Sequence, residues 1–96
     1  MKTLENYLDD FKEKMHIGSD YQLAKELKVT RQQISKIRNG EIALGREKCL
    51  RLATGLKVDP LEVIAVVEAA KEKNPEVRAM WVRLAKEKGV KHKRAG

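Results

Sequence analysis

Residues 20–40, which read DYQLAKELKVTRQQISKIRNG, decide the fold of this chain. Apolar side chains recur at helical spacing on both sides of a short break at residues 28–29, which predicts two short helices. Thr30 follows the break and can cap the second helix, residues 31–38. A connection this short prevents the two helices from lying antiparallel, so they meet at an angle, as in a helix-turn-helix. The apolar residues expected to fill that angle are Leu23, Leu27, Val29, Ile34 and Ile37.

Four more helices are expected around this pair, at about residues 4–15, 46–56, 60–73 and 76–88. No segment has the alternation of a strand, and the composition favours helix, so we expect an all-α protein. We divide the chain into a helix-turn-helix domain over residues 1–73 and a C-terminal helix with a basic tail over residues 74–96.

Local signals mark the ends of the last two helices. Asp59 and Pro60 form a helix start, and Glu62 stands where a capping box returns a hydrogen bond to the cap. Gly89 is expected to end the last helix, because glycine readily adopts the left-handed conformation of a helix C-terminus. The basic tail that follows, residues 90–96, is expected to be disordered.

Length and composition limit the class of protein. The 96 residues leave room for one domain, and 42% hydrophobic with 36% charged residues is globular composition. No apolar run approaches the roughly 20 residues of a membrane span, and no signal peptide is recognisable, so we expect a cytoplasmic protein. Cys49 is the single cysteine and is expected in the core, while His16 and His92 lack ligand spacing. We expect neither an enzyme nor a metal or cofactor.

The positive charge is concentrated in two segments. The chain carries a net charge of +7, of which residues 28–51 contribute +5 and residues 86–96 contribute +4, while the rest is close to neutral or acidic. Such clustering favours a polyanionic partner, most simply nucleic acid. The alternative is a set of charges that only keeps the protein soluble.

The stretch from Tyr21 to Gly40 resembles the Cro and phage-repressor family, also called the lambda-repressor-like domain. The Leu-Ala pair at residues 23–24, the Ile-Ser-Lys-Ile core at residues 34–37 and the closing Asn39-Gly40 stand where that family has them. The resemblance covers about residues 3–59 and implies a five-helix helix-turn-helix domain that binds double-stranded DNA. Lys28 stands where the family usually has glycine, and a left-handed lysine there would be strained by roughly 1 kcal/mol.

The resemblance also implies which side chains face DNA. On the second helix it places toward the base edges Arg31, Gln32, Gln33, Ser35 and Lys36. Periodicity agrees, because the two isoleucines of that helix must point inward, and Arg and Gln side chains can pair bidentately with guanine and adenine. Contacts to the DNA backbone are expected from Ser19, Lys28, Thr30, Arg38, Asn39, Arg46 and Lys48. Asp20 receives no base contact, because its carboxylate repels phosphate. The alternative is an ordinary solvated helix face.

The apolar residues of the last two helices leave two interpretations open. Trp81 and its neighbours either fold the last helix back onto the core or present an apolar surface to a second copy. The resemblance favours pairing after the fourth helix, which would place two DNA-reading helices one turn apart, about 34 Å, on a pseudo-palindromic operator. For such a homodimer the candidate interface residues are Leu61, Ile64, Val67, Met80 and Trp81.

These expectations combine into a transcriptional regulator, a phage or prophage repressor that acts by occupying its operator. One alternative is an antitoxin of the same fold, which binds a toxin and represses its own operon, so a protein antagonist or toxin is a second expected class of partner. Another is a protein-interaction module with a vestigial helix-turn-helix, for which the charge of residues 28–51 would be unnecessary. An RNA-binding protein ranks lower, because no aromatic platform for stacked bases is visible.

Overall fold

The computed structural model describes the backbone of residues 2–95 and the side chains of residues 2–89. Within this part of the chain all regular structure is helical, which confirms the all-α expectation. The helices are α1 (Leu4–Lys14), α2 (Asp20–Leu27), α3 (Arg31–Arg38), α4 (Arg46–Leu56), α5 (Pro60–Lys71) and α6 (Pro75–Ala95). None of the described helices is long and apolar enough to cross a membrane.

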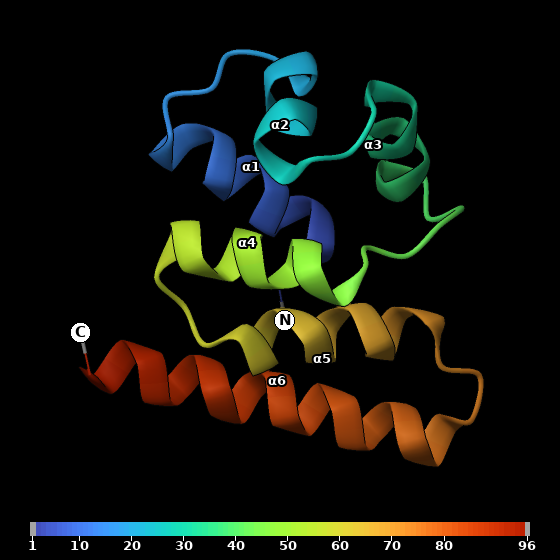
Figure 1. The fold of residues 1–96 in the computed structure, drawn as a ribbon. Helices are drawn as coiled ribbons and strands as arrows, with labels where there is room; N and C mark the ends of the chain where they lie inside the picture. Colours follow the sequence, from blue (N-terminus) through green and yellow to red (C-terminus); the bar gives the residue numbers. More distant parts are fainter. Residues whose placement is uncertain (1, 96) are drawn as a thin grey trace.

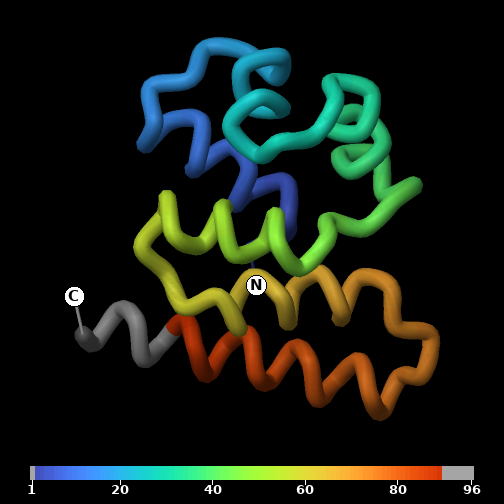
Figure 2. The backbone as a smooth tube through the Cα atoms, in the orientation of Figure 1, coloured from blue at the N-terminus to red at the C-terminus, as the bar shows by residue number. Residues whose placement is uncertain are grey.

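The helices are arranged with the helix-turn-helix at one end of the molecule and α6 at the other. Figure 1 shows α2 and α3 at the top, α4 across the middle, and α5 and α6 running side by side in opposite directions below it. The backbone trace in Figure 2 shows the same order, with a tight connection between α2 and α3. The helices α4 and α5 therefore lie between α3 and α6.

Side chains next to the helix starts explain why the helices begin where they do. Thr3, Ser19 and Thr30 each accept a hydrogen bond from a backbone N–H in the first turn that follows, and Asp59 does the same for α5. These bonds satisfy donors that have no partner within a helix. The two caps expected from the sequence, Thr30 for α3 and Asp59 for α5, are therefore confirmed.

Two lysines close helices in the left-handed conformation. Lys28 ends α2 with φ 61° and ψ 40°, and Lys57 ends α4 with φ 59° and ψ 40°. In each case the following residue donates a backbone hydrogen bond to a carbonyl five residues earlier, Val29 to Ala24 at 2.9 Å and Val58 to Ala53 at 3.0 Å. This bonding pattern is the Schellman motif, in which glycine is the usual left-handed residue. The left-handed conformation considered for Lys28 is therefore present, and Lys57, which the sequence did not single out, repeats it.

The core lies between the five N-terminal helices and has α6 packed against it. The largest fully buried side chains are Leu8, Leu23, Leu27, Ile34, Leu52, Val63 and Cys49. Cys49 is thus a core residue, as expected, and burial raises the pKa of its thiol to about 11. Only Ile34 and Ile37 of α3 are buried, Arg38 is half-buried, and the other five residues of the helix are exposed.

Two expectations for the last helices are wrong. Glu62 does not complete a capping box, because its carboxylate is buried and accepts a hydrogen bond from the Tyr7 hydroxyl of α1. Burial, together with this hydrogen bond, raises the pKa of the Tyr7 hydroxyl. Gly89 does not end α6, which continues to Ala95. An internal glycine destabilises a helix by only about 1 kcal/mol relative to alanine, and packing along α5 offsets this. The side chains of the expected basic tail, residues 90–96, lie outside the described residues.

The packing of α6 answers one question that the sequence left open. Trp81 is half-buried and packs against the core, together with Leu84, and Ala85 is fully buried. The last helix therefore folds back onto its own chain. Of the five candidate interface residues, Val67 is also buried and Ile64 packs against the core, whereas Leu61 and Met80 are 43% and 60% exposed.

Candidate nucleic-acid interface

Five polar side chains of α3 are exposed, and the four of them that form no hydrogen bond to the described part of the chain are what we call the outer face of α3: Arg31, Gln32, Ser35 and Lys36. They lie on the side of the helix that faces away from the buried Ile34 and Ile37. Among the described residues these four side chains form no hydrogen bond or ion pair with one another or with the rest of the chain. They are therefore positioned to bond to a ligand without first giving up a partner.

Gln33 has a different role from its neighbours, because it belongs to the capping box that starts α3. The Thr30 hydroxyl oxygen accepts from the Gln33 backbone N–H at 3.0 Å, and the Gln33 side-chain oxygen accepts from the Thr30 backbone N–H at 2.8 Å. A bidentate contact to adenine needs both the oxygen and the NH₂ of the amide, so Gln33 would have to leave the cap to make one. We therefore regard Gln33 as a residue that positions α3 and withdraw it from the base-reading set.

Two hydroxyl groups at helix starts remain suited to phosphate. Ser19 accepts from the Gln22 backbone N–H at 3.2 Å, and Thr30 accepts within the capping box described above. A hydroxyl that accepts a hydrogen bond still has its own proton to donate. Both residues are exposed, one at the start of α2 and the other at the start of α3.

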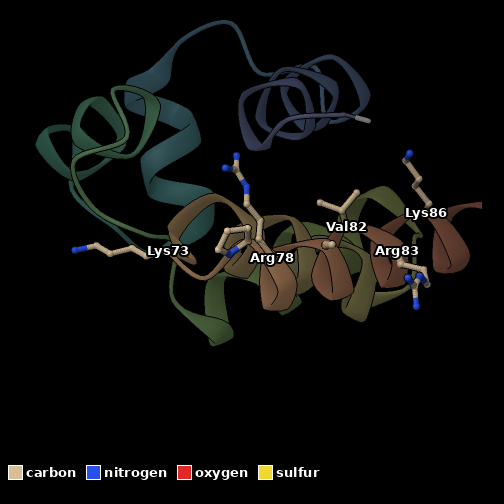
Figure 3. Close-up of a pocket in the computed structure, with 7 residues that line it drawn as sticks. Lys73, Arg78, Val82, Arg83 and Lys86 are labelled. Carbon is tan, nitrogen blue, oxygen red and sulfur yellow. The ribbon is translucent and has the colours of Figure 1, made fainter.

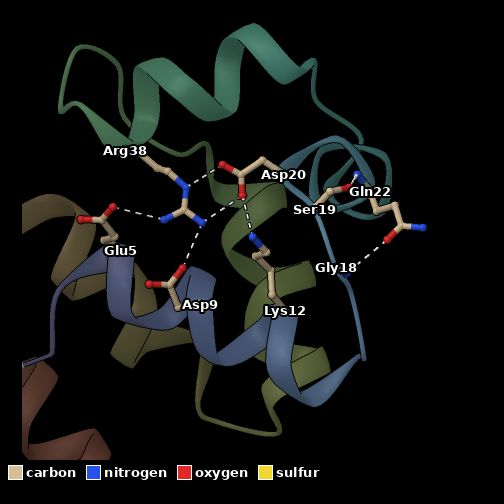
Figure 4. Close-up of polar contacts among 8 residues, drawn as sticks. All are labelled: Glu5, Asp9, Lys12, Gly18, Ser19, Asp20, Gln22 and Arg38. Carbon is tan, nitrogen blue, oxygen red and sulfur yellow. Dashed lines mark hydrogen bonds and ion pairs between the residues drawn. The ribbon is translucent and has the colours of Figure 1, made fainter.

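Arg38 is held inside the protein by carboxylates from two other helices, an arrangement that we call the Arg38 network (Figure 4). Its guanidinium donates to Asp20 of α2 at 3.0 and 3.1 Å, to Asp9 of α1 at 3.0 Å and to Glu5 of α1 at 3.2 Å. The Lys12 ammonium group also donates a hydrogen bond to the Asp20 carboxylate, at 2.9 Å. The network ties the last turn of α3 to α1 and α2.

The geometry of the network removes Arg38 from the expected DNA contacts. Only 17% of its side chain is exposed, and all its outer nitrogens are engaged by carboxylates. Burial alone would lower the pKa of the guanidinium, but the hydrogen bonds to Asp20 and Asp9 outweigh it and raise the pKa. The hydrogen bond from Arg38, with that from Lys12, holds the pKa of the Asp20 carboxyl below its usual range. Asp20 is thus an anchor for α3, which explains an acid at this position.

The remaining expected backbone contacts are spread around α3. Lys28 precedes the helix and is exposed, and Asn39 follows it and is exposed. A hollow of about 240 Å³ brings Asn39 together with Arg31 and Ser35, beside the Arg38 network. Arg46 is exposed at the start of α4, whereas Lys48 is half-buried and lies 3.7 Å from the Glu47 carboxylate.

Sequence reasoning missed the carboxylates of the Arg38 network, although one signal was available. Glu5 and Asp9 are four residues apart, so they share one face of α1, adjacent to its buried stripe. Two acids on such a face can receive a cation from a neighbouring helix. Which cation it is depends on the angle between α1 and α3, and local patterning does not define that angle.

The comparison with protein families agrees with this geometry. The family model HTH_3, described as helix-turn-helix, matches residues 14–63, which contain α2, α3 and α4 whole and the first turn of α5. No curated protein and no solved structure matches the chain. The family model covers half of the chain, and the matched helices α2 and α3 carry the outer face of α3 and two members of the Arg38 network, Asp20 and Arg38. The chain therefore belongs to the Cro/C1-type helix-turn-helix family of DNA-binding transcription regulators.

Proposed function

We propose that this regulator represses transcription by placing α3 in the major groove of an operator, in the manner of a phage or prophage repressor. The observation that carries the proposal is the outer face of α3, where four polar side chains are exposed and unbonded within the described chain. Arg31 and Gln32 lie in the first turn of α3, the end that usually enters the groove most deeply, and so have the main role in base recognition. Ser35 and Lys36 contribute one turn further along.

Backbone contacts set the register of the protein on DNA in this proposal. Lys28, Ser19 and Thr30 approach phosphates beside the starts of α2 and α3, and Asn39, Arg46 and Lys48 do so beyond the end of α3. Such contacts supply affinity that falls with salt concentration but carry no sequence information. The regulator bound at its operator then sterically excludes RNA polymerase from the promoter.

We also propose that the protein binds as a homodimer. One short helix reads only a few base pairs, and a two-fold pair would read an inverted repeat with half-sites about 34 Å apart. Leu61 and Met80 remain the candidate interface residues, because they are the exposed members of the original set. Trp81, Ile64 and Val67 serve the packing of their own chain.

The proposal is tested by selecting bound duplexes from a random DNA pool at low and at physiological salt. We expect enrichment of an inverted repeat, and we expect Arg31→Ala to change the preferred base at one position in each half-site, at about 1–3 kcal/mol of lost discrimination. The matched control is Arg83→Ala, which removes the same charge from α6, beyond α4 and α5. An Arg31→Ala protein that selects the same sequences would contradict base reading by α3, and a pool without any enriched sequence would contradict operator recognition altogether.

A further inference from the structure

The outward side of α6 has a groove of about 560 Å³, which we call the α6 groove. Its walls carry four cationic side chains, Lys73, Arg78, Arg83 and Lys86, and its floor includes the apolar Ala79 and Val82. Figure 3 shows Arg78, Val82, Arg83 and Lys86 along the helix and Lys73 just before its start. Among the residues whose side chains the structure describes, no carboxylate lines the groove.

The residues of the α6 groove form one continuous stripe of the helix. From Pro75 to Lys86 they recur every three or four positions, which places them on one face over about 17 Å, or three turns. Trp81, Leu84 and Ala85 pack toward the core, and Ala85, seven residues after Arg78, lies at the edge between the groove and the core. The outward face of α6 is therefore not simply polar, because it combines the apolar floor of the groove with cations.

The cations of the α6 groove have no ion-pair partner among the described residues. By contrast, the neighbouring Lys71 lies 3.1 Å from the Glu68 carboxylate, and Arg51 of α4 lies 3.1 Å from Glu47. The four groove cations share this lack of an ion-pair partner with the cations of the outer face of α3, for which an anionic partner is already proposed. This unbalanced charge favours a partner that supplies carboxylates or phosphates.

Two features distinguish between the anionic partners. Nucleic acid held by α3 cannot extend to the groove, because α4 and α5 lie between α3 and α6 (Figure 1). Phosphates also gain nothing from the apolar floor, whereas a helix with small apolar residues flanked by acids would bury Ala79 and Val82 and pair with the four cations. A second copy using the same face would bring like charges together, which is unfavourable.

We propose that the α6 groove binds an acidic amphipathic helix of a partner protein. The partner helix has about three turns, with an apolar stripe that covers Ala79 and Val82 and with Glu or Asp on both sides of that stripe. Because the groove and the outer face of α3 lie at opposite ends of the molecule, partner and operator bind at the same time. This inference goes beyond the proposed function and does not depend on the operator sequence.

The test uses a displayed library of three-turn helical peptides, with Glu or Asp at the flanking positions and varied apolar residues in the stripe. Selection is made on the full chain, with counter-selection on the double variant Arg78→Glu/Arg83→Glu. The control variant Lys25→Glu/Lys57→Glu has the same net charge but keeps the groove. Circular dichroism and thermal unfolding establish that each variant is folded.

A third variant separates a helix site from a general polyanion site. Ala79→Arg fills the floor of the groove and adds a cation, and arginine is a good helix former. The substitution should weaken the binding of an amphipathic helix, which loses its apolar contact. It should strengthen the binding of a simple polyanion. Polyglutamate and a random DNA duplex serve as the competing probes.

We expect enriched peptides whose affinity falls at least tenfold on Arg78→Glu/Arg83→Glu and on Ala79→Arg, and stays within twofold on the control variant. Their binding should leave the affinity of the chain for DNA unchanged. The proposal is overturned if no peptide is enriched over the counter-selected pool, or if polyglutamate or DNA competes fully and Ala79→Arg tightens binding. It is also overturned if the charge reversal changes the sedimentation of the protein alone, which would indicate a self-interface.

Discussion

The helices α3 and α6 both present cationic, outward-facing surfaces, but they are held in place by different forces. α3 has 8 residues and buries only Ile34 and Ile37, so its orientation depends on its capping box and on the Arg38 network. α6 has 21 residues and lies along α5, where apolar packing suffices. A helix of two turns is unstable alone, so it needs directional bonds at both ends. The polar surface between those ends is then free to contact DNA.

The largest expected effect comes from removing one of the two apolar anchors of α3. Ile34 is fully buried, so Ile34→Ala should lower the free energy of unfolding by about 2–5 kcal/mol through lost burial and a cavity. Val77→Ala, on the half-buried inner side of α6, should cause a smaller loss, because the cavity it leaves is open to solvent. Urea unfolding at neutral pH measures both. Equal losses would show that α6 depends on single anchors as strongly as α3 does.

The next effect comes from the Arg38 network. We predict that Arg38→Met lowers the free energy of unfolding by about 1–2 kcal/mol, because two of the three carboxylates are exposed enough for water to screen them. The matched control is Arg51→Ala, which removes an exposed pair with Glu47 and should change stability by less than about 0.5 kcal/mol.

The affinity of Arg38→Met for DNA gives a second, independent test of the Arg38 network. Arg38→Met should weaken affinity for the selected operator, because α3 is held less firmly, but it should leave the slope of log affinity against log salt unchanged. A phosphate contact would contribute about 1 to that slope. A slope reduced by about 1 would return Arg38 to the backbone-contact set and contradict its purely internal role.

The network also predicts how stability depends on pH. The folded-state pKa of Asp20 is lowered, so its contribution is present above the ordinary carboxyl value of 3.8 and is lost as pH falls through the lowered value. The stability difference between the unmodified chain and Arg38→Met should therefore be constant near neutral pH and shrink below pH 3.8. If the stability difference between the two proteins persists at low pH, it comes from packing of the arginine side chain and not from its bonds to carboxylates.

The comparison of α3 with α6 also separates what the sequence could and could not predict. The bounds of α3 follow from its cap and apolar spacing, and those of α4 from apolar spacing alone, so local patterning was enough for both. The bond between Tyr7 and Glu62 joins residues 55 positions apart and could not be read locally. The end of α6 was predicted wrongly at Gly89, because tertiary packing along α5 outweighs the weak helix propensity of one glycine. The DNA-contact residues other than Arg38 and Gln33 stay predictions.

The smallest expected effect concerns the two left-handed lysines and gives the most closely matched pair in the molecule. Lys28 and Lys57 have nearly the same φ and ψ and the same Schellman bonding, but only Lys28 lies directly before α3. Replacement by glycine relieves the left-handed strain and also increases the entropy of the unfolded chain, so each variant should gain at most about 1 kcal/mol of stability. Equal gains in urea unfolding would show that the strain is local to the turn.

DNA binding should distinguish the two lysines even where stability does not. Lys28→Gly removes a proposed phosphate contact, so it should lower the operator affinity and reduce the salt slope by about 1, whereas Lys57→Gly should leave both unchanged. Since the two substitutions are equivalent in backbone conformation and charge, a difference between them comes from position alone. If the two variants bind DNA alike, Lys28 is only a strained turn residue, and the salt-dependent affinity comes from the cations on α3 and after it.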